Sequence, residues 1–273
     1  MIGIAFALLS AVGYGASDFA AGMLSRRAHF VLVGWVGQAT AAVLTVVMVL
    51  VAGTAVPALS VLGWGAIAGA GAAVGTLALY HGLAVGQMSV AAPLSAVGAA
   101  GLPVLFDVIT SGLLPIGGLI GVAAALPGIW LVSSSGGSSD RGGGVVPGLI
   151  AGVGFAVLFI GLDRAGDGAG LWPVAASQCA ALAVITGLAL AWRPGGPRPS
   201  WTAMWPGIFG ASATVMYFLA THHGSLSVAA VITSLYPAIT IGLAGVILHE
   251  RTTRVQNLGL GLCGAAVCAF AVS

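Results

Sequence analysis

Charged residues are scarce in this chain, and lysine is absent. Only 5% of the 273 residues are charged, and the eight cations are all arginine, whereas soluble domains carry about 25% charged residues. A water-soluble fold needs a polar surface that this composition does not supply, so the sequence excludes a soluble protein. The net charge of +2 is too small to predict binding to nucleic acid.

Cysteine is also rare, and its positions do not fit the common metal and redox motifs. Cys179, Cys263 and Cys268 lie inside apolar runs, at spacings that suit neither metal ligation nor redox exchange. No cluster of His, Cys and Asp has the spacing of metal ligands. We therefore predict neither a metal site nor a cofactor, and we interpret the cysteines as small apolar residues.

Long apolar runs fill most of the chain, since 59% of its residues are hydrophobic. A helix needs about 20 apolar residues to cross a bilayer, and Arg, Pro, Gly and Ser divide the chain into runs of about that length. The first run carries an acid and is too long for a signal peptide, so we count it as a span. We predict an all-α membrane protein with ten transmembrane helices, at residues 2–24, 30–53, 61–86, 88–110, 113–133, 145–163, 171–192, 203–223, 227–248 and 255–272.

The two halves of the chain resemble each other weakly. A Gly- and Ser-rich linker over 136–144 separates a first unit, 1–135, from a second unit, 145–273. Because five is an odd number, a second copy of five helices must be inserted upside down. We therefore predict two inverted five-helix repeats, which is a transporter architecture. The matching residues, in chain order, are Gly3 with Gly148, Asp18 with Asp163, Trp64 with Trp205 and Ser89 with Ser227.

The arginines predict an orientation in the membrane. The loops after even-numbered helices hold only Arg164, and cytoplasmic loops are the ones enriched in arginine. We therefore expect the odd-numbered loops in the cytoplasm and both termini outside. Cations that are all arginine, together with abundant Ala, Gly and Val, suggest a bacterial protein, so we expect a multi-pass protein of the plasma (inner) membrane. The arginines of the odd-numbered loops are Arg26, Arg27, Arg141, Arg193, Arg198, Arg251 and Arg254.

The end of the chain resembles a known family. Ser234-Leu235-Tyr236-Pro237, then an apolar run, His249-Glu250-Arg251 and Gly259, looks like the closing signature of the drug/metabolite transporter superfamily, EamA branch. The segment Tyr14-Gly15-Ala16-Ser17-Asp18-Phe19 is similar to that family's first-helix motif. The resemblance implies a ten-helix inverted-repeat fold whose central cavity opens alternately to the two sides. It also implies transport of amino acids, other metabolites or drugs, commonly outward and often coupled to protons.

Two features depart from what the resemblance implies. Gly112 stands where the second half has Glu250, so the acidic residue at the end of this motif is single here. Members of the family usually keep both termini in the cytoplasm, and the arginines predict the opposite. The orientation therefore stays open at the level of the sequence.

Asp18 is the strongest candidate for a functional residue. It lies about two-thirds of the way along the first predicted helix, and a charge at that depth in a bilayer is costly. Tyr14 lies one turn earlier on the same face. We predict that both face a central cavity and bind a proton or a cationic group; the alternative is a hydrogen bond between helices or contact with interface water. Asp107, Asp163 and Glu250 lie nearer helix ends and fit structural roles better.

Polar and aromatic residues within the spans are further candidates. Polar faces inside a span should point to protein or water, a histidine can relay protons, and proline removes a backbone hydrogen bond. Anchoring at the membrane interface is the alternative for the aromatic residues, and proline is common in membrane helices. We predict substrate-binding or coupling roles for Asp18, Tyr14, Trp35, Gln38, Tyr80, His81, Tyr217, Thr233 and Tyr236, and gating or hinge roles for Pro93, Pro103 and Pro237.

A carrier of small organic solutes accounts best for these features. We expect an exporter of metabolites such as amino acids, cationic or zwitterionic compounds or drugs, working by alternating access and coupled to protons. The sparse buried arginine argues against a phosphate-bearing solute. We do not expect an enzyme, because the sequence shows no nucleophile motif, metal site or paired carboxylates. A channel or passive membrane scaffold remains the alternative, and an intramembrane enzyme is the least supported one.

Overall fold

The computed structural model describes residues 1–25, 27–84, 88–133, 145–166, 168–195, 197, 199–247 and 253–272. These residues form α-helices and one 3₁₀ turn, and no strand occurs among them. The elements are α1 (Ile2–Ser25), α2 (Phe30–Ala52), α3 (Leu59–Ala84), α4 (Met88–Ser111), α5 (Ile116–Ser133), α6 (Val145–Arg164), α7 (Trp172–Trp192), η1 (Trp201–Ala203), α8 (Met204–His222), α9 (Leu226–Thr233), α10 (Tyr236–Ile247) and α11 (Arg254–Val272).

The predicted all-α membrane fold is confirmed. Each predicted span has a helical counterpart, with α9 and α10 together forming the ninth. Within the described residues, eight helical segments are long and apolar enough to cross a bilayer, and α5 adds a shorter apolar stretch, Ile116–Leu131. Large apolar side chains face outward along the helices, such as Leu50, Ile109 and Leu190. A surface of this kind is stable only against lipid, so the chain is a multi-pass membrane protein.

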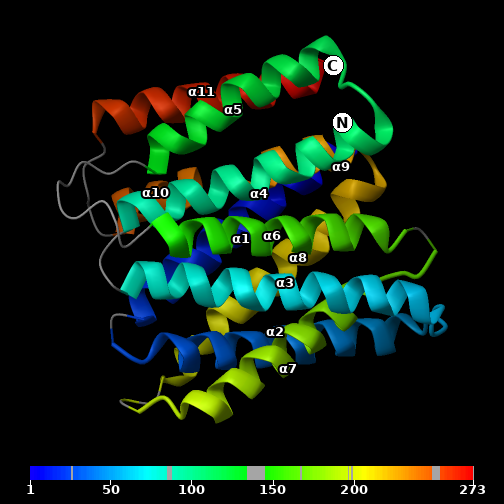
Figure 1. The fold of residues 1–273 in the computed structure, drawn as a ribbon, viewed down its shortest axis with the longest axis vertical. Helices are drawn as coiled ribbons and strands as arrows, with labels where there is room; N and C mark the ends of the chain where they lie inside the picture. The colour runs from blue at the N-terminus through cyan, green and yellow to red at the C-terminus, as the bar shows by residue number, and fades with distance from the viewer. Residues whose placement is uncertain are drawn as a thin grey trace.

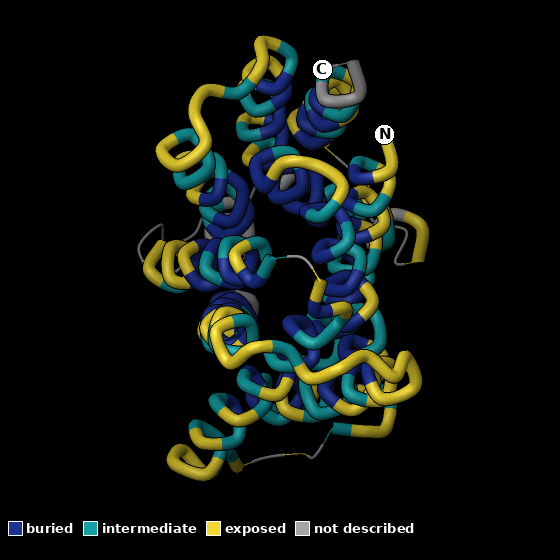
Figure 2. Tube along the Cα trace, turned by 90° about the vertical axis from the view of Figure 1, so that its right-hand side faces the viewer, coloured by how far each residue is buried: buried dark blue, intermediate teal, exposed yellow. Residues whose placement is uncertain are grey.

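The helices lie side by side in an elongated bundle (Figure 1). One end of the bundle is the pair α5 and α11, and the opposite end is the pair α2 and α7. Between them, α1 packs against α8 and α3 packs against α6. In the tube view, where many helices are seen nearly end-on, buried residues gather toward the middle and exposed residues lie outside (Figure 2).

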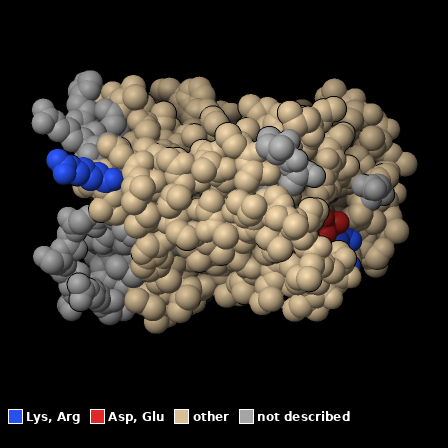
Figure 3. All heavy atoms as spheres, turned by 90° about the horizontal axis from the view of Figure 1, so that it is seen from above, with Lys and Arg blue, Asp and Glu red and all other residues tan. Residues whose placement is uncertain are grey.

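Helix α6 runs opposite to α1 (Figure 1). The C-terminal ends of α1 and α7 and the N-terminal end of α11 lie at one side of the bundle, where Arg27, Arg193 and Arg254 occur. Both termini lie at the other side. The face that carries α5 and α11 shows charged side chains only near its two ends (Figure 3). Arg26, Arg141, Arg198, Glu250, Arg251 and the predicted linker 136–144 lie outside the described residues.

Glycines bring several helix backbones into direct contact. A methyl group at Gly65 of α3 would lie 2.6 Å from the backbone oxygen of Pro173 on α7. One turn further along, a methyl group at Gly69 would overlap the backbone oxygen of Ser177. Gly207 of α8 meets the backbone of α2 in the same way. Such positions hold helices closer together than larger side chains allow, and they bring the central polar groups within reach of each other.

The ninth span is divided into two helices, which the sequence did not predict. The helical path ends at Thr233 and begins again at Tyr236. Pro237 falls in the first turn of α10, where a missing backbone N–H costs little. By contrast, α4 continues without a break past Pro93 and Pro103. Of the three predicted hinge prolines, only Pro237 therefore coincides with an interruption of its helix.

Asp107 caps a helix from a neighbouring one. Its Oδ2 accepts hydrogen bonds from the backbone N–H of Ser227, at 3.1 Å, and from the Ser227 hydroxyl, at 2.6 Å. The first N–H groups of a helix have no partner within it, and Ser227 lies in the first turn of α9. Asp107 therefore joins α4 to α9, which agrees with the structural role expected for it.

Replacing Gly69 by alanine should destabilise the protein, because the new methyl group must push α3 away from α7. Overpacking of this kind costs about 1–3 kcal/mol. Gly63→Ala, on the same helix, is the matched control, since nothing lies within 4 Å of a Cβ there. Thermal unfolding in one detergent should show a lower midpoint for Gly69→Ala than for Gly63→Ala. Equal midpoints would contradict the close contact between α3 and α7.

Candidate functional site

A cavity lies in the middle of the bundle, among helices from both halves of the chain. Its volume is about 90 Å³, which is room for several water molecules or a small organic solute. Its lining residues come from α1, α2, α3, α6, α7, α8 and α10. Among the described residues that line it, Asp18 is the single charged one. The polar residues of the lining are Tyr14, Ser17, Asp18, Gln38, Thr76, Tyr80, Ser177, Gln178, Thr214 and Tyr236.

Five of the residues predicted to bind or couple solute line this one cavity. They are Tyr14 and Asp18 from α1, Gln38 from α2, Tyr80 from α3 and Tyr236 from α10. They come from four helices, one of them far along the chain, so helix packing alone brings them together. Their shared location supports the interpretation of these residues as one site.

Two other predicted residues, Trp35 and His81, point to the outside of the bundle. The Trp35 side chain is 39% exposed, and its Nε1 donates a hydrogen bond of 2.9 Å to the Thr186 hydroxyl. His81 is exposed, and its ring lies 5.6 Å from the ring of Phe30. Although His81 follows Tyr80 directly, the helix turns it away from the cavity.

Tyr217 and Thr233 are buried beside the cavity but do not line it. The Tyr217 ring stacks on Phe159 with 4.3 Å between centroids, and its hydroxyl donates to the Phe159 backbone oxygen at 3.1 Å. Thr233 is fully buried, and its hydroxyl lies 3.5 Å from the backbone oxygen of Ala7. Because Phe159 itself lines the cavity, Tyr217 supports the cavity wall from behind.

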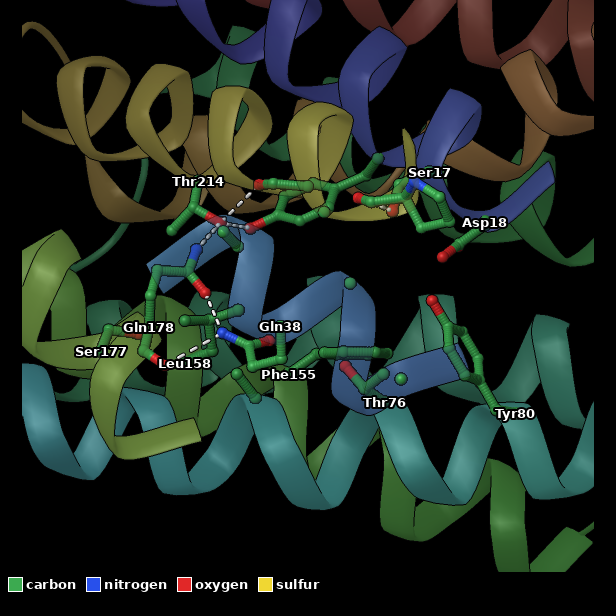
Figure 4. Close-up of a pocket in the computed structure, with 18 of the residues that line it drawn as sticks. Ser17, Asp18, Gln38, Thr76, Tyr80, Phe155, Leu158, Ser177, Gln178 and Thr214 are labelled. Atoms are coloured by element: carbon green, nitrogen blue, oxygen red, sulfur yellow. Dashed lines mark hydrogen bonds between the residues drawn. The ribbon is translucent and has the colours of Figure 1, made fainter. Parts of the chain in front are cut away.

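Asp18 faces the cavity with its carboxylate. The neighbouring Ser17 hydroxyl donates to the backbone oxygen of Pro206 at 2.9 Å, which fixes this part of α1 against α8. Asp18 and the Tyr80 hydroxyl point toward each other across the open space (Figure 4). Within the described part of the chain, the Asp18 carboxylate accepts no hydrogen bond and forms no ion pair. A charged carboxylate at this depth is costly unless a proton, water or a cation accompanies it.

A chain of hydrogen bonds forms the opposite wall. The Gln38 amide donates to the Gln178 side-chain oxygen and to the Gln178 backbone oxygen, the latter at 3.1 Å. The Gln178 amide donates to the Thr214 hydroxyl at 3.2 Å, and the Tyr14 hydroxyl lies 2.9 Å from the same oxygen. Thr214 donates its own proton to the Gly210 backbone oxygen at 2.8 Å, so Tyr14 must be the donor toward Thr214.

Gln178, Thr214 and Ser177 also line the cavity, and the sequence did not predict them as candidates. Each is a single polar residue within a mainly apolar helix, a weak signal in a chain with many such positions. Gln178 had one further signal, since it lies at nearly the same place in the second half as Gln38 in the first. That correspondence becomes visible only when α2 and α7 are seen to pack together.

Aromatic rings cover much of the remaining lining. Tyr14, Tyr80, Phe155, Phe159 and Tyr236 all contribute to it. The face of an aromatic ring is electron-rich and attracts cations, and the cavity holds one acid and no base among its described residues. The arrangement therefore favours a positively charged or neutral guest over an anion.

Comparisons with known proteins agree with the fold and with the resemblance seen in the sequence. The model of the EamA-like transporter family matches residues 142–272, which confirms the predicted resemblance. No curated protein matches the sequence. A solved structure described only as "Crystal structure of protein" is similar over 99% of this chain and 96% of that chain, with a TM-score of 0.75 and 15% sequence identity. At that identity the likeness concerns the fold alone.

Replacing Thr214 by valine should destabilise the cavity wall, because Gln178 and Tyr14 both lose an acceptor in a buried place. Leaving such donors unsatisfied costs about 1–3 kcal/mol each. Ser212→Ala, on the exposed side of the same helix, is the matched control. The unfolding midpoint should fall for Thr214→Val, stay unchanged for Ser212→Ala and recover in Thr214→Ser. A Thr214→Val midpoint equal to that of the control would contradict the hydrogen-bonded chain.

Proposed function

Because residues 142–272 match the model of the EamA-like transporter family, we propose that this chain is a secondary transporter of small organic metabolites. It works by alternating access, as an exporter in the plasma (inner) membrane of a bacterium. Its solutes are cationic or zwitterionic compounds, a class that includes amino acids and drugs. The observation that carries this proposal is the unpartnered Asp18 carboxylate in a cavity of solute size.

The Asp18 carboxylate needs a positive partner or a proton. In a membrane interior, an acid is either neutralised or paired, because the charge alone is costly. A solute with an ammonium group supplies the missing charge, and a proton replaces it when the solute leaves. If the solute and a proton compete for the Asp18 carboxylate, transport of the solute is coupled to protons, because the proton binds only after the solute has left and the solute binds only after the proton has left.

The aromatic lining supports an organic cation rather than a hydrated metal ion. A ring face attracts an alkylammonium group by cation–π contact, and the attraction grows when water is removed. Tyr80, Tyr236 and Tyr14 line the same cavity as Asp18. A guest that combines positive charge with an apolar surface can bind both the Asp18 carboxylate and the aromatic rings.

The chain path supports the proposal of two inverted repeats. Helices α1 and α6, each the first of its half, run in opposite directions (Figure 1). Helix α1 packs on α8, and its counterpart α6 packs on α3, the counterpart of α8. Helix α2 packs on its own counterpart α7, and α5 on α11. This is the pattern expected of two halves related by a pseudo-twofold axis in the membrane plane.

Residues that line the cavity follow the same correspondence. Tyr14 and Phe159 are 145 positions apart, like Asp18 and Asp163. Since paired residues surround the cavity, we place the pseudo-twofold axis through it. The paired lining residues are Tyr14 with Phe159, Gln38 with Gln178 and Thr76 with Thr214.

The proposed axis gives a physical basis for alternating access. If the two halves exchange their conformations, a cavity open to one side becomes a cavity open to the other. Residues near the axis keep contact with the solute in both states. Asp18 breaks the symmetry, because its counterpart Asp163 lies at the end of α6, outside the lining.

Counterflow in proteoliposomes tests the function. Vesicles loaded with unlabelled solute should take up labelled choline, a cation, or labelled alanine, a zwitterion, in a saturable manner. Asp18→Asn should reduce this exchange by roughly 30-fold or more, because removing one member of a desolvated charge pair costs at least about 2 kcal/mol. Asp18→Glu, which keeps the charge, is the matched control and should retain more exchange than Asp18→Asn.

Two outcomes would contradict the proposal. Flux that does not saturate and shows no counterflow would indicate a channel, which is the alternative function. Exchange by Asp18→Asn at the wild-type rate, with the protein monodisperse in detergent, would remove Asp18 from the binding site.

A further inference from the structure

The cavity has two chemically different ends (Figure 4). At one end, Asp18 faces Tyr80 and provides a negative charge. At the other end lie the side chains of Gln38, Gln178 and Ser177, which are polar but uncharged. A guest that fills the cavity touches both ends, so the chemistry of the neutral end restricts the solute further than Asp18 does.

The neutral end contains a buried hydroxyl without a partner. Ser177 is 1% exposed, and among the described residues no group forms a hydrogen bond with its Oγ. Buried hydroxyls are nearly always hydrogen-bonded, and an exception calls for a missing partner. Ser177 is one of the lining residues, but its Oγ is closed off from the open space, so a guest becomes that partner only when the wall around the hydroxyl shifts to admit it.

Gln38 and Gln178 each keep one group free for a guest. Gln38 uses its amide N–H groups to reach the side chain and the backbone of Gln178, which leaves its oxygen as an acceptor on the side away from Gln178 (Figure 4). Gln178 uses one amide N–H for Thr214 and has a second one left. The neutral end therefore offers both donors and an acceptor.

A carboxylate fits this end poorly. It can only accept hydrogen bonds, and it is held in proteins by Arg, Lys or helix N-termini. No Arg, Lys or His occurs among the described lining residues, and the free Gln38 oxygen would repel an anion. A hydroxyl or a carboxamide both donates and accepts, which matches the groups that Ser177, Gln38 and Gln178 leave unsatisfied.

We propose that the solute is a small organic cation with a neutral hydrogen-bonding group, a hydroxyl or a carboxamide, at its other end. Its ammonium group lies at Asp18, and its hydroxyl or carboxamide lies at Ser177 and Gln178. A zwitterion that carries a carboxylate in place of that group is excluded. The inference rests on the proposed transport function and narrows its solute class.

Three probes of similar size separate these possibilities. Choline is a cation with a hydroxyl, propyltrimethylammonium replaces that hydroxyl by a methyl group, and betaine replaces the alcohol by a carboxylate. Each is tested as an unlabelled competitor of choline counterflow in proteoliposomes of the full chain. We expect choline to compete at a concentration roughly tenfold lower than either of the others, since a buried hydrogen bond left unmade costs at least about one order of magnitude.

Ser177→Ala provides the matched variant. Because the Ser177 hydroxyl has no partner among the described residues, removing it breaks no hydrogen bond there, and the unfolding midpoint should not fall. The preference for choline over propyltrimethylammonium should shrink several-fold. Ser212→Ala, exposed on α8, should keep the wild-type preference. Asp18→Asn should lose exchange of both cations.

The outcomes distinguish the inference from the function on which it rests. If wild type exchanges choline but the three probes compete equally, the polar residues of the neutral end do not contribute to solute selectivity. The inference is then wrong, while the carrier function stands. The same holds if betaine competes best or if Ser177→Ala keeps the full preference. If wild type exchanges alanine and none of the cations, the solute class is wrong although the chain is a carrier. If it exchanges nothing, both proposals fail.

Discussion

The absence of water in the bilayer is the constraint on which the rest of this structure depends. Backbone groups must find partners inside the chain, which only helices provide for a single segment. Polar side chains follow the same rule: Thr45 donates back to its own helix, and Tyr217 donates to the backbone of Phe159. Against this background, the described residues include three buried hydroxyls without a partner, those of Ser25, Ser177 and Ser234. Of these only Ser177 lines the cavity, which it shares with the Asp18 carboxylate, and the proposed solute would bind between them.

Close packing sets the positions of those groups. Because Gly65 and Gly69 bring α3 against α7, and Gly207 brings α8 against α2, side chains as short as Thr214 and Gln178 can meet across helices. The hydrogen-bonded chain from Gln38 to Tyr14 then links α2, α7, α8 and α1. It also fixes which donors are already used, so the groups left free are a consequence of helix packing rather than of composition.

Much of the fold could be predicted from the sequence, because hydropathy acts on whole segments. The division of the ninth span could not, since Pro237 is compatible with either a kink or a break until its neighbours are placed. For the candidate site, Asp18 and Gln38, which line the cavity, could be predicted as candidates because polar groups at bilayer depth are rare and costly. His81 and Trp35 were predicted to take part in binding or coupling, but their side chains point out of the bundle. The rotation of a nearly all-apolar helix about its axis is set by packing that the sequence does not reveal. Gln178 and Ser177 were missed for the same reason.

The two kinds of polar group differ in how they relate to the proposed axis, and that difference bears on mechanism. In the proposed repeats, Gln38 and Gln178 occupy corresponding places, and their side chains are hydrogen-bonded to each other, so an exchange of conformation between the halves would leave the pair in place. Asp163, the proposed counterpart of Asp18, lies at a helix end and not in the lining. Under the proposed alternating access, the charge contact would therefore change when the access side changes, whereas the neutral contacts would persist. A solute held by both would keep its polar end fixed while its ammonium end gains or loses its counter-charge, and that alternation is what a carrier needs to bind on one side and release on the other.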